Sequence, residues 1–314
     1  MQTISRAFLR ITEKDFARLV GTSVSELPHQ CRELLAKYDL SYKKIQIKER
    51  DKIILNVLKR INSDQLSVSG KENKTRWKKG WRENLKNFIE KKYNLSELVP
   101  KYVRPNHPMR LFGEYVVPHD PKFELYYYTI FRIWFFKKYI GKAKTIYEFG
   151  CGSGYNLPIL AQLFPKAELH GLDWARESKT IVDKLGNIYH WNIQGHVFDM
   201  FSPNKKFKLV PNCAVITLGG LEQLGDNYQK FLNYVMKQSP KICLHYEPLL
   251  ELYNENILFD YLAILYHKRR NYLGNFLTTL KRLESDNKIK ILKFKRMFGS
   301  LYHDGSYVVW KTNN

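Results

Sequence analysis

The sequence has few cysteines and no spacing typical of a metal site, and both features exclude classes of protein. Four cysteines are scattered over 314 residues, at Cys31, Cys151, Cys213 and Cys243. This scatter fits a reduced chain better than a disulfide framework, which is dense in cysteine. His107, His119 and Asp120 lie near one another, but no H-x-x-x-H motif or carboxylate cluster accompanies them. We therefore predict no metal site.

Long apolar runs are also missing. No stretch of about 18 uncharged apolar residues occurs, so no transmembrane helix is expected. The first residues contain no uninterrupted apolar stretch before Glu13, Lys14 and Asp15, which does not fit a signal peptide. Together with the scattered cysteines, these absences predict a cytoplasmic protein.

Acidic residues are outnumbered, at 30 against 52 lysines and arginines, and the net charge is +22. Such a field favours anionic partners, namely nucleic acid, phosphorylated metabolites or acidic lipid surfaces. A solvated basic surface without a partner would explain the charge equally well. With 44 % hydrophobic and 14 % aromatic residues, the chain can bury a core, and disorder of the whole chain is excluded.

The two halves of the chain differ in pattern. Apolar residues recur at helical spacing in the first hundred residues, for example Phe16, Leu19 and Val20. Five prolines between residues 100 and 121 predict an irregular connection, and an aromatic helix is expected at 123–139.

Beyond Gly141, short apolar runs alternate with helical segments. Strands are expected at 145–149, 167–172, 196–198, 213–218, 241–246, 289–298 and 306–310, and helices at 157–164, 175–185, 228–236 and 252–283. Alternation of strands and helices predicts a parallel sheet with helices on both faces. Only a turn separates the last two strands, so the sheet should have an antiparallel edge.

A glycine-rich turn lies between the first of these strands and its helix. It contains Gly150, Gly152 and Gly154, and glycine allows positive φ and close approach of a ligand to the backbone. A plain tight turn would explain this motif alone. Asp173 follows Gly154 by nineteen residues, at the end of the second strand, where a carboxylate can bind a ribose diol.

Two further acids distinguish this site from a dinucleotide site. Glu148 precedes the first glycine by two residues, where it would repel a pyrophosphate and suit a cofactor with a cationic amino-acid end. Asp199 follows the third strand, in position to face an adenine amine. Asp173 and Asp199 could instead be helix caps or surface acids.

As a set, the segments EFGCGSG, HGLDWA, HVFDMF and CAVITLGGLEQL resemble the class I SAM-dependent methyltransferases over about residues 140–314. The resemblance implies an enzyme with S-adenosyl-L-methionine as cofactor. It implies an α/β fold with a Rossmann-like, seven-stranded, mostly parallel sheet whose last strand is antiparallel. We divide the chain into a mainly helical N-terminal region, 1–110, and a methyltransferase domain, 111–314. The cofactor-binding residues that the resemblance implies are Glu148, Gly150, Gly152, Gly154, Asp173, Trp174, Asp199, Met200 and Leu218.

Catalytic candidates lie at the carboxyl ends of the fourth and fifth strands, where active groups gather in open α/β sheets. His245 and Glu247 alternate along the fifth strand and should share one face. We expect His245 to be the general base and Glu247 to orient it or to bind acceptor hydroxyls. His245 could instead be a buried histidine bonded to backbone. Glu222, after the fourth strand, is a third candidate that could instead cap a helix.

Acceptor specificity in the family usually comes from N-terminal elements and insertions. The corresponding candidates here are Tyr115, His119, His267 and Arg270. The last two belong to a run of cations and aromatic rings that could hold a phosphate or stack on a ring, although such a run is also typical of a solvated helix face.

These observations favour O-methylation of a small polar or anionic acceptor, such as a sugar, a nucleotide-sugar or a saccharide end group. An RNA methyltransferase is the first alternative, favoured by the net charge and by Trp77 and Trp81 one helical turn apart among cations. The fourth-strand segment lacks the N/D-P-P-Y/F signature of base-amine methylation, which disfavours it. A non-catalytic interaction protein with the same fold is the second alternative. The acceptor and the oligomeric state stay open.

Overall fold

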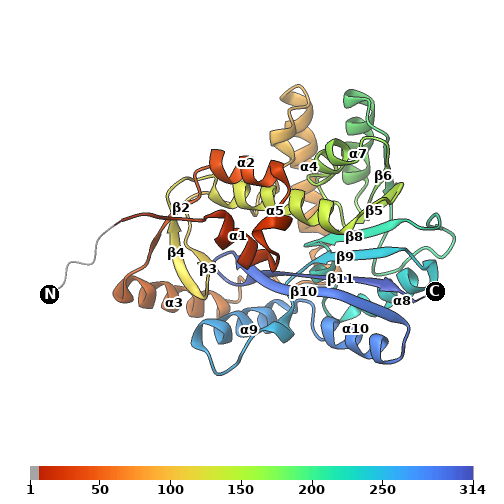
Figure 1. The fold of residues 1–314 in the computed structure, drawn as a ribbon. Coiled ribbons are helices and arrows are strands. Elements are labelled where there is room, and N and C mark those ends of the chain that lie inside the picture. The colour runs from red at the N-terminus through yellow and green to blue at the C-terminus, as the bar shows by residue number, and fades with distance from the viewer. Residues whose placement is uncertain (1–6, 314) are drawn as a thin grey trace.

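The computed structural model describes residues 7–313, which form one sheet of eleven strands with helices on both faces (Figure 1). The strand order is β1-β2-β4-β3-β10-β11-β9-β8-β5-β6-β7. The strands are β1 Leu9–Arg10, β2 Ser41–Lys44, β3 Met109–Leu111, β4 Glu114–Pro118, β5 Thr145–Phe149, β6 Glu168–Asp173, β7 Ile193–Val197, β8 Ala214–Leu218, β9 Ile242–Tyr246, β10 Ile289–Gly299 and β11 Asp304–Thr312.

Ten α-helices and five short 3₁₀ helices connect these strands within the described residues. The α-helices are α1 Glu13–Val20, α2 His29–Lys37, α3 Ile47–Ile61, α4 Lys74–Glu90, α5 Phe123–Tyr139, α6 Leu157–Leu163, α7 Arg176–Tyr189, α8 Gln229–Gln238, α9 Leu258–Arg270 and α10 Phe276–Ser285. The 3₁₀ helices are η1 Val24–Glu26, η2 Lys71–Asn73, η3 Leu95–Leu98, η4 Leu221–Tyr228 and η5 Leu250–Leu252. No helix in the described part of the chain has the length and apolarity needed to cross a membrane.

The predicted α/β arrangement is confirmed in the C-terminal part. β5 pairs in parallel with β6 and β8, β6 with β7, and β8 with β9, while β11 runs antiparallel to β9 and β10. The seven strands that the resemblance implies are therefore present, and the last of them is reversed.

Two features of the predicted sheet are corrected. The sheet has eleven strands rather than seven, because β1 to β4 extend it beyond β10. Of the described pairings, four are parallel and six are antiparallel, so the sheet as a whole is not mostly parallel. β1 to β4 contain two to five residues each, too few for an alternating pattern to be visible in the sequence.

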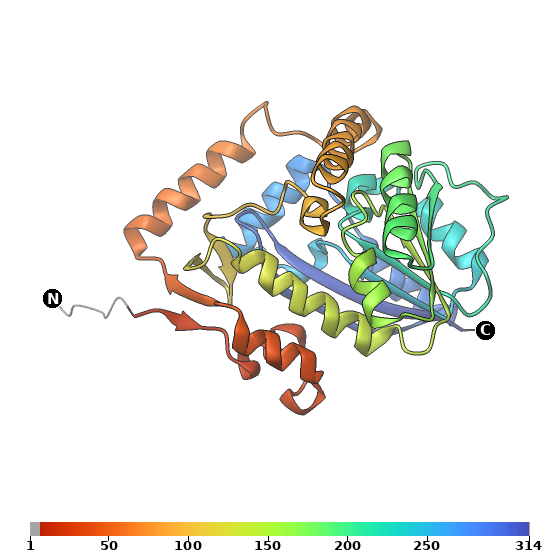
Figure 2. The ribbon, with the colours of Figure 1, turned by 90° about the horizontal axis from the view of Figure 1, so that it is seen from above.

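Alternation of side chains along the strands separates two hydrophobic cores. On β8, Ala214 and Ile216 face the core formed with α5, α6 and α7, whereas Val215 faces the core formed with α8 and α10. Figures 1 and 2 show these helices on opposite faces of the sheet. The carboxyl ends of the central strands are left free for a site.

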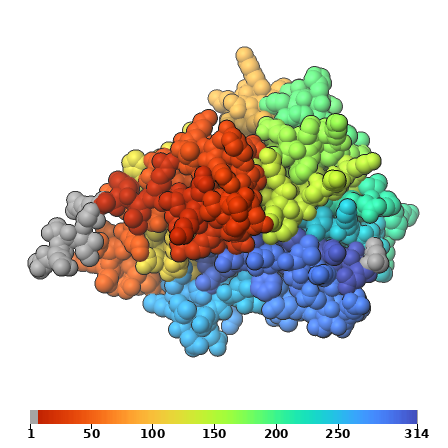
Figure 3. All heavy atoms as spheres, viewed as in Figure 1, coloured from red at the N-terminus to blue at the C-terminus, as the bar shows by residue number. Residues whose placement is uncertain are grey.

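The N-terminal region packs against the rest of the chain. α1 contacts β10, α2 contacts α5, α3 contacts α9, and α4 contacts α7. Phe16 and Cys31 belong to the same core as α5. Figure 3 shows the N-terminal segment in red lying directly against the C-terminal segment in blue. The predicted boundary at residue 110 falls inside β3, and the division into two domains stays a prediction.

The helix expected at 252–283 is two helices, which corrects the sequence prediction. α9 ends at Arg270, and α10 begins at Phe276. Asn271 and Asn275 between them adopt left-handed conformations, with φ of 50° and 57°. Asparagine tolerates this conformation well, so the segment turns instead of continuing the helix.

Candidate functional site

A cavity of about 690 Å³ lies at the carboxyl ends of β5, β6, β8 and β9. Its volume falls in the range of small-molecule sites in proteins. One half of its wall comes from the glycine turn and the ends of the parallel strands. The other half comes from α4, α5, the end of α9 and the segment 300–305. The N-terminal region therefore contributes part of the wall.

The glycine turn has the backbone that the sequence suggests, and two of its glycines face the cavity. Gly150 and Gly152 have φ of 71° and 54°. A Cβ on Gly150 would lie 3.1 Å from Gly220 Cα, and a Cβ on Gly152 would lie 2.7 Å from the Trp81 ring. Gly154 does not line the cavity. A Cβ there would lie 3.2 Å from Leu185, so this glycine lets the turn pack on α7.

Glu148 is 1 % exposed and lines the cavity. Its Oε1 accepts a hydrogen bond of 2.6 Å from Asn156 Nδ2, and Asn156 Oδ1 in turn accepts one of 3.1 Å from Arg132 Nη1. Glu148 Oε2 has no hydrogen-bond partner among the described residues. Burial raises the pKa of Glu148 to about 7. The site thus presents a buried carboxylate oxygen that needs a donor, which suits a cationic ammonium group.

The two acids at the ends of β6 and β7 also face the cavity. Asp173 accepts backbone hydrogen bonds from Gly152 (3.1 Å) and Ala175 (2.9 Å), so it links β6 to the glycine turn. Burial raises the pKa of Asp173 to about 6. Asp199 Oδ1 accepts a hydrogen bond of 2.9 Å from the Phe201 N–H, and Asp199 Oδ2 forms an ion pair with Lys74 Nζ at 2.5 Å. The other predicted residues of this half, Trp174, Met200 and Leu218, line the same wall.

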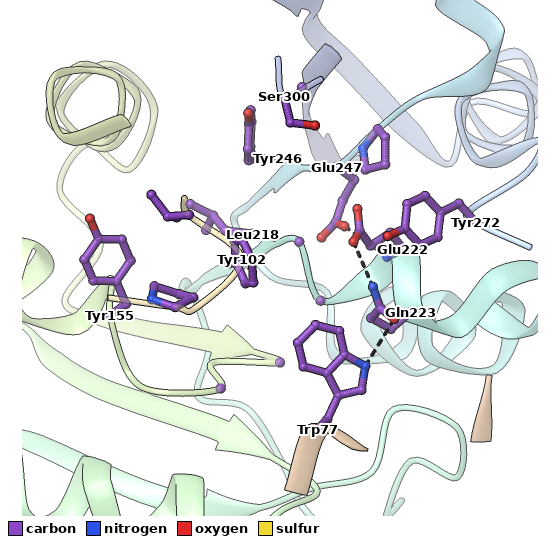
Figure 4. Close-up of a pocket in the computed structure, with 18 of the residues that line it drawn as sticks. Trp77, Tyr102, Tyr155, Leu218, Glu222, Gln223, Tyr246, Glu247, Tyr272 and Ser300 are labelled. Carbon is purple, nitrogen blue, oxygen red and sulfur yellow. Dashed lines mark hydrogen bonds between the residues drawn. The ribbon is translucent and has the colours of Figure 1, made fainter. Parts of the chain in front are cut away.

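Helix α4 supplies wall residues that the sequence analysis did not place in the site. Trp77 and Trp81 stack with ring centroids 5.5 Å apart, and Trp77 Nε1 donates a hydrogen bond of 3.3 Å to Gln223 Oε1 (Figure 4). The spacing of the two tryptophans was visible in the sequence, but their partners are distant along the chain. Stacked rings beside a glycine turn offer a flat apolar wall for a planar group.

Glu222 and Glu247 form a pair of carboxyl groups at the far end of the cavity. Figure 4 shows them beside each other, close to Tyr272. Glu247 is 1 % exposed and accepts hydrogen bonds of 3.0 Å from the backbone N–H groups of Leu221 and Glu222. Burial raises the pKa of Glu247 to about 7, and burial together with the charge of Glu247 raises that of Glu222 to about 8. The pair of carboxyl groups can therefore take up or release a proton near neutral pH.

The structure does not bring His245 to the cavity. The side chain is 2 % exposed and packs between Phe276 and Trp310, and its Nδ1 lies 2.9 Å from Thr217 Oγ1. Burial lowers its pKa to about 3. β9 ends at Tyr246, so the alternation that would have put His245 and Glu247 on one face stops before Glu247. His245 is thus a core histidine, and Tyr246 lines the cavity instead.

Of the four residues expected to contact the acceptor, Arg270 lines the cavity and the other three do not. Tyr115 is buried against Phe259, with ring centroids 5.0 Å apart. His119 lies on the surface, where its Nδ1 contacts Asp39 Oδ2 at 2.6 Å. His267 is buried beside Tyr272, and burial lowers its pKa. His267 and Arg270 are thus only three residues apart in the sequence, but only Arg270 lines the cavity.

Several aromatic and basic wall residues carry no signal in the sequence. Tyr246 Oη donates a hydrogen bond of 2.8 Å to Tyr128 Oη, and the Arg132 guanidinium lies 3.8 Å from the centre of the Tyr155 ring. Tyr102 completes this wall. Within residues 7–313, no group of three or more His, Cys, Asp or Glu side chains is arranged to hold a metal ion.

A comparison with protein-family models finds no match, and a comparison with curated proteins finds none either. The solved structures to which the chain is similar include several SAM-dependent methyltransferases. They include the methyltransferase domain of bacterial CtHen1 (19 % identity, 54 % of this chain and 90 % of that chain, TM-score 0.41). The small RNA methyltransferase HEN1 has 15 % identity over 59 % of this chain and 25 % of that chain, with a TM-score of 0.45.

A third similar structure is the geranyl diphosphate C-methyltransferase from Streptomyces coelicolor A3(2). It has 10 % identity over 62 % of this chain and 85 % of that chain, with a TM-score of 0.40. At such low identities and TM-scores, these similarities bear neither on the acceptor of this chain nor on the residues that act. Those follow from the cavity itself.

Proposed function

We propose that the chain is a SAM-dependent methyltransferase that methylates a hydroxyl oxygen of a small polar or anionic acceptor. The observation that carries the proposal is that a single cavity joins two chemically distinct halves. One half contains the glycine turn, Glu148 and Asp173, and the other contains Glu222 and Glu247. A cofactor held in the first half would present its reactive end toward the second.

The residues of the first half fit S-adenosyl-L-methionine. Glu148 Oε2, a buried carboxylate oxygen with no partner within residues 7–313, would accept a hydrogen bond from the ammonium group. Asp173 would accept hydrogen bonds from the ribose hydroxyls, since each carboxylate oxygen has a second lone pair. Asp199 and Met200 would contact the adenine. The bound cofactor supplies a methyl group activated on a sulfonium, so the protein contributes alignment and electrostatics.

The second half of the cavity would remove the acceptor proton. Glu247 is held by two backbone N–H groups, which stabilise its charged form. Glu222, whose pKa is the higher of the two, is the stronger base. In this proposal the deprotonated carboxylate of Glu222 would accept the proton of the acceptor hydroxyl. The hydroxyl oxygen would bond to the methyl carbon as the carbon–sulfur bond breaks, with its electron pair going to sulfur and S-adenosylhomocysteine as the leaving group. A base with a pKa near the working pH is the most effective choice for such a transfer.

Transfer of labelled methyl from S-adenosyl-L-methionine to a panel of acceptors tests this proposal. The panel contains free sugars, sugar phosphates, nucleoside diphosphate sugars and total transfer RNA. Label in a small acceptor, at an ether linkage stable to mild base, is the expected result. Label in RNA alone would contradict the small-acceptor proposal and favour the alternative that the net charge of +22 suggests.

A further inference from the structure

Three arginines from three different helices line the cavity. Arg60 comes from α3, Arg76 from α4 and Arg270 from α9. Arg76 Nη1 and Arg270 Nη1 both donate a hydrogen bond to the same atom, Ser67 Oγ. The guanidinium groups of Arg76 and Arg270 therefore lie side by side, although both are positively charged.

The positive charge of this arginine cluster (Arg60, Arg76 and Arg270) is not neutralised by ion pairs. None of the three guanidinium groups forms an ion pair with a carboxylate in residues 7–313. Glu222 is near enough to Arg270 for their charges to interact, but the two side chains form no ion pair within the described residues.

Arg270 shows the imbalance most clearly. It is 7 % exposed, and its Nη2 donates a hydrogen bond of 2.7 Å to Tyr272 Oη, a neutral acceptor. Its Nε has no hydrogen-bond partner in the part of the chain that the structure describes. A buried cation with a free donor is costly unless an anion compensates it. This cation lines the cavity, so the compensating anion can come from a ligand.

We propose that Arg60, Arg76 and Arg270 bind a phosphate group of the acceptor, which makes the acceptor a small phosphate ester. This inference rests on the proposed function. Planar guanidinium groups bind phosphate oxygens with pairs of parallel hydrogen bonds, and several converging cations match a group with more than one negative charge. Glu222 interacts with both Arg270 and Glu247, so the phosphate would lie next to the carboxyl pair. The hydroxyl to be methylated would then be close to the phosphate.

The phosphate could belong to a sugar phosphate or to a nucleoside diphosphate, and the chemistry at the arginine cluster is the same for both. Burial of Arg270 favours a small ester over a nucleic acid, because only a group that enters the cavity can reach it. A nucleic acid backbone would mainly meet cations on the open surface instead.

Calorimetry on the full chain saturated with S-adenosylhomocysteine tests the proposal. The probes are glucose 1-phosphate, UDP and uncharged glucose. The test variants are Arg270→Gln and Arg76→Gln, and the matched control is Arg269→Gln. Arg269 neighbours Arg270 on α9, but it pairs with Asp64 and does not line the cavity.

The expected result is that at least one phosphate probe binds and glucose does not. Both test variants should weaken binding of that probe by about tenfold or more, which is typical of a lost charge-assisted hydrogen bond. Arg269→Gln should bind it as wild type does, and all variants should bind S-adenosylhomocysteine equally. Binding of glucose 1-phosphate alone or of UDP alone would support the proposal and identify the source of the phosphate.

Other results would overturn it. Normal binding of S-adenosylhomocysteine, with no phosphate probe bound or with equal probe binding in wild type and both variants, would remove the phosphate site and leave the proposed function intact. Displacement of the probe mainly by an RNA oligonucleotide, with a steep salt dependence, would replace the small ester by nucleic acid. No binding of S-adenosylhomocysteine to wild type would end both proposals. If Arg270→Gln fails to fold, the exposed Arg76 decides the question.

Discussion

The Trp81 ring of α4 lies directly over Gly152 of the glycine turn, so that a Cβ on Gly152 would be 2.7 Å from the ring. These residues are far apart in the sequence, and each comes from a different region of the chain. Their contact means that the N-terminal region closes over the half of the cavity that we assign to the cofactor. The tightness of this contact leads to the first prediction.

Gly152→Ala should weaken binding of S-adenosylhomocysteine by at least about tenfold, or about 1.4 kcal/mol. The added methyl would push Trp81 away, and φ of 54° strains any residue with a side chain. Calorimetric titration measures the effect. Gly80→Ala is the matched control, because nothing lies within 4 Å of a Cβ there and the residue is inside α4. The control should keep its affinity and gain stability; equal losses in the two variants would contradict the account.

Asp173→Ala should also weaken the binding of S-adenosylhomocysteine by at least about tenfold. The change removes the proposed acceptor of the ribose hydroxyls and the hydrogen bond that holds the Gly152 N–H. Asp226→Ala, on the surface, serves as the control. Wild-type affinity in Asp173→Ala would remove this aspartate from the cofactor site.

The rate of methyl transfer should rise with pH. The general base acts only when deprotonated, and the pKa values of Glu247 and Glu222 are raised to about 7 and about 8. Turnover should therefore increase as the pH passes upward through this interval. In Glu247→Gln the residual activity should show a lower apparent pKa, because the charge of Glu247 helps to raise the pKa of Glu222. A pH–rate profile measures both effects. A rate that does not change between about pH 6 and about pH 9 would argue against Glu222 and Glu247 as the groups that take up the proton.

His245→Asn should change stability and leave turnover almost unchanged. The pKa of His245 falls from an ordinary value to about 3 in the folded chain, so the unfolded chain binds one more proton between about pH 3 and 6.5. The free energy of unfolding of the wild-type chain therefore decreases as the pH falls through this window. Removing the histidine should reduce the slope of the unfolding free energy by at most about 1.4 kcal/mol per pH unit. Urea unfolding at several pH values measures the slope, and a large loss of turnover in a folded variant would return His245 to the site.

Structural features that depend on residues close together in the sequence can be predicted from it. The strand, glycine turn and following helix around Gly150 form one local unit, and Asp173 ends the next strand, so both could be placed on the cavity wall in advance. The residue at which a strand ends is harder to predict. His245 was misplaced because β9 ends one residue before Glu247, and strand ends depend on pairing with neighbours rather than on the residue pattern.

Contacts between distant segments could not be predicted. Trp81 and Arg270 face the same cavity because α4 packs against α7 and α9 packs against α3, which are contacts between distant segments. The sequence showed a pair of tryptophans and a run of cations, but neither pattern identifies the distant segments that it contacts, and a run of cations is also typical of a solvated helix face. The strands β1 to β4 were missed for a related reason, because their stability comes from joining the edge of a larger sheet.

Titration calorimetry with S-adenosylhomocysteine, run beside NAD, measures whether the cavity binds S-adenosyl-L-methionine. We expect micromolar binding of S-adenosylhomocysteine and no binding of NAD, because Glu148 would repel a pyrophosphate and attract an ammonium group. Binding of NAD, or no binding of S-adenosylhomocysteine by the folded chain, would mean that the cavity is not a site for S-adenosyl-L-methionine.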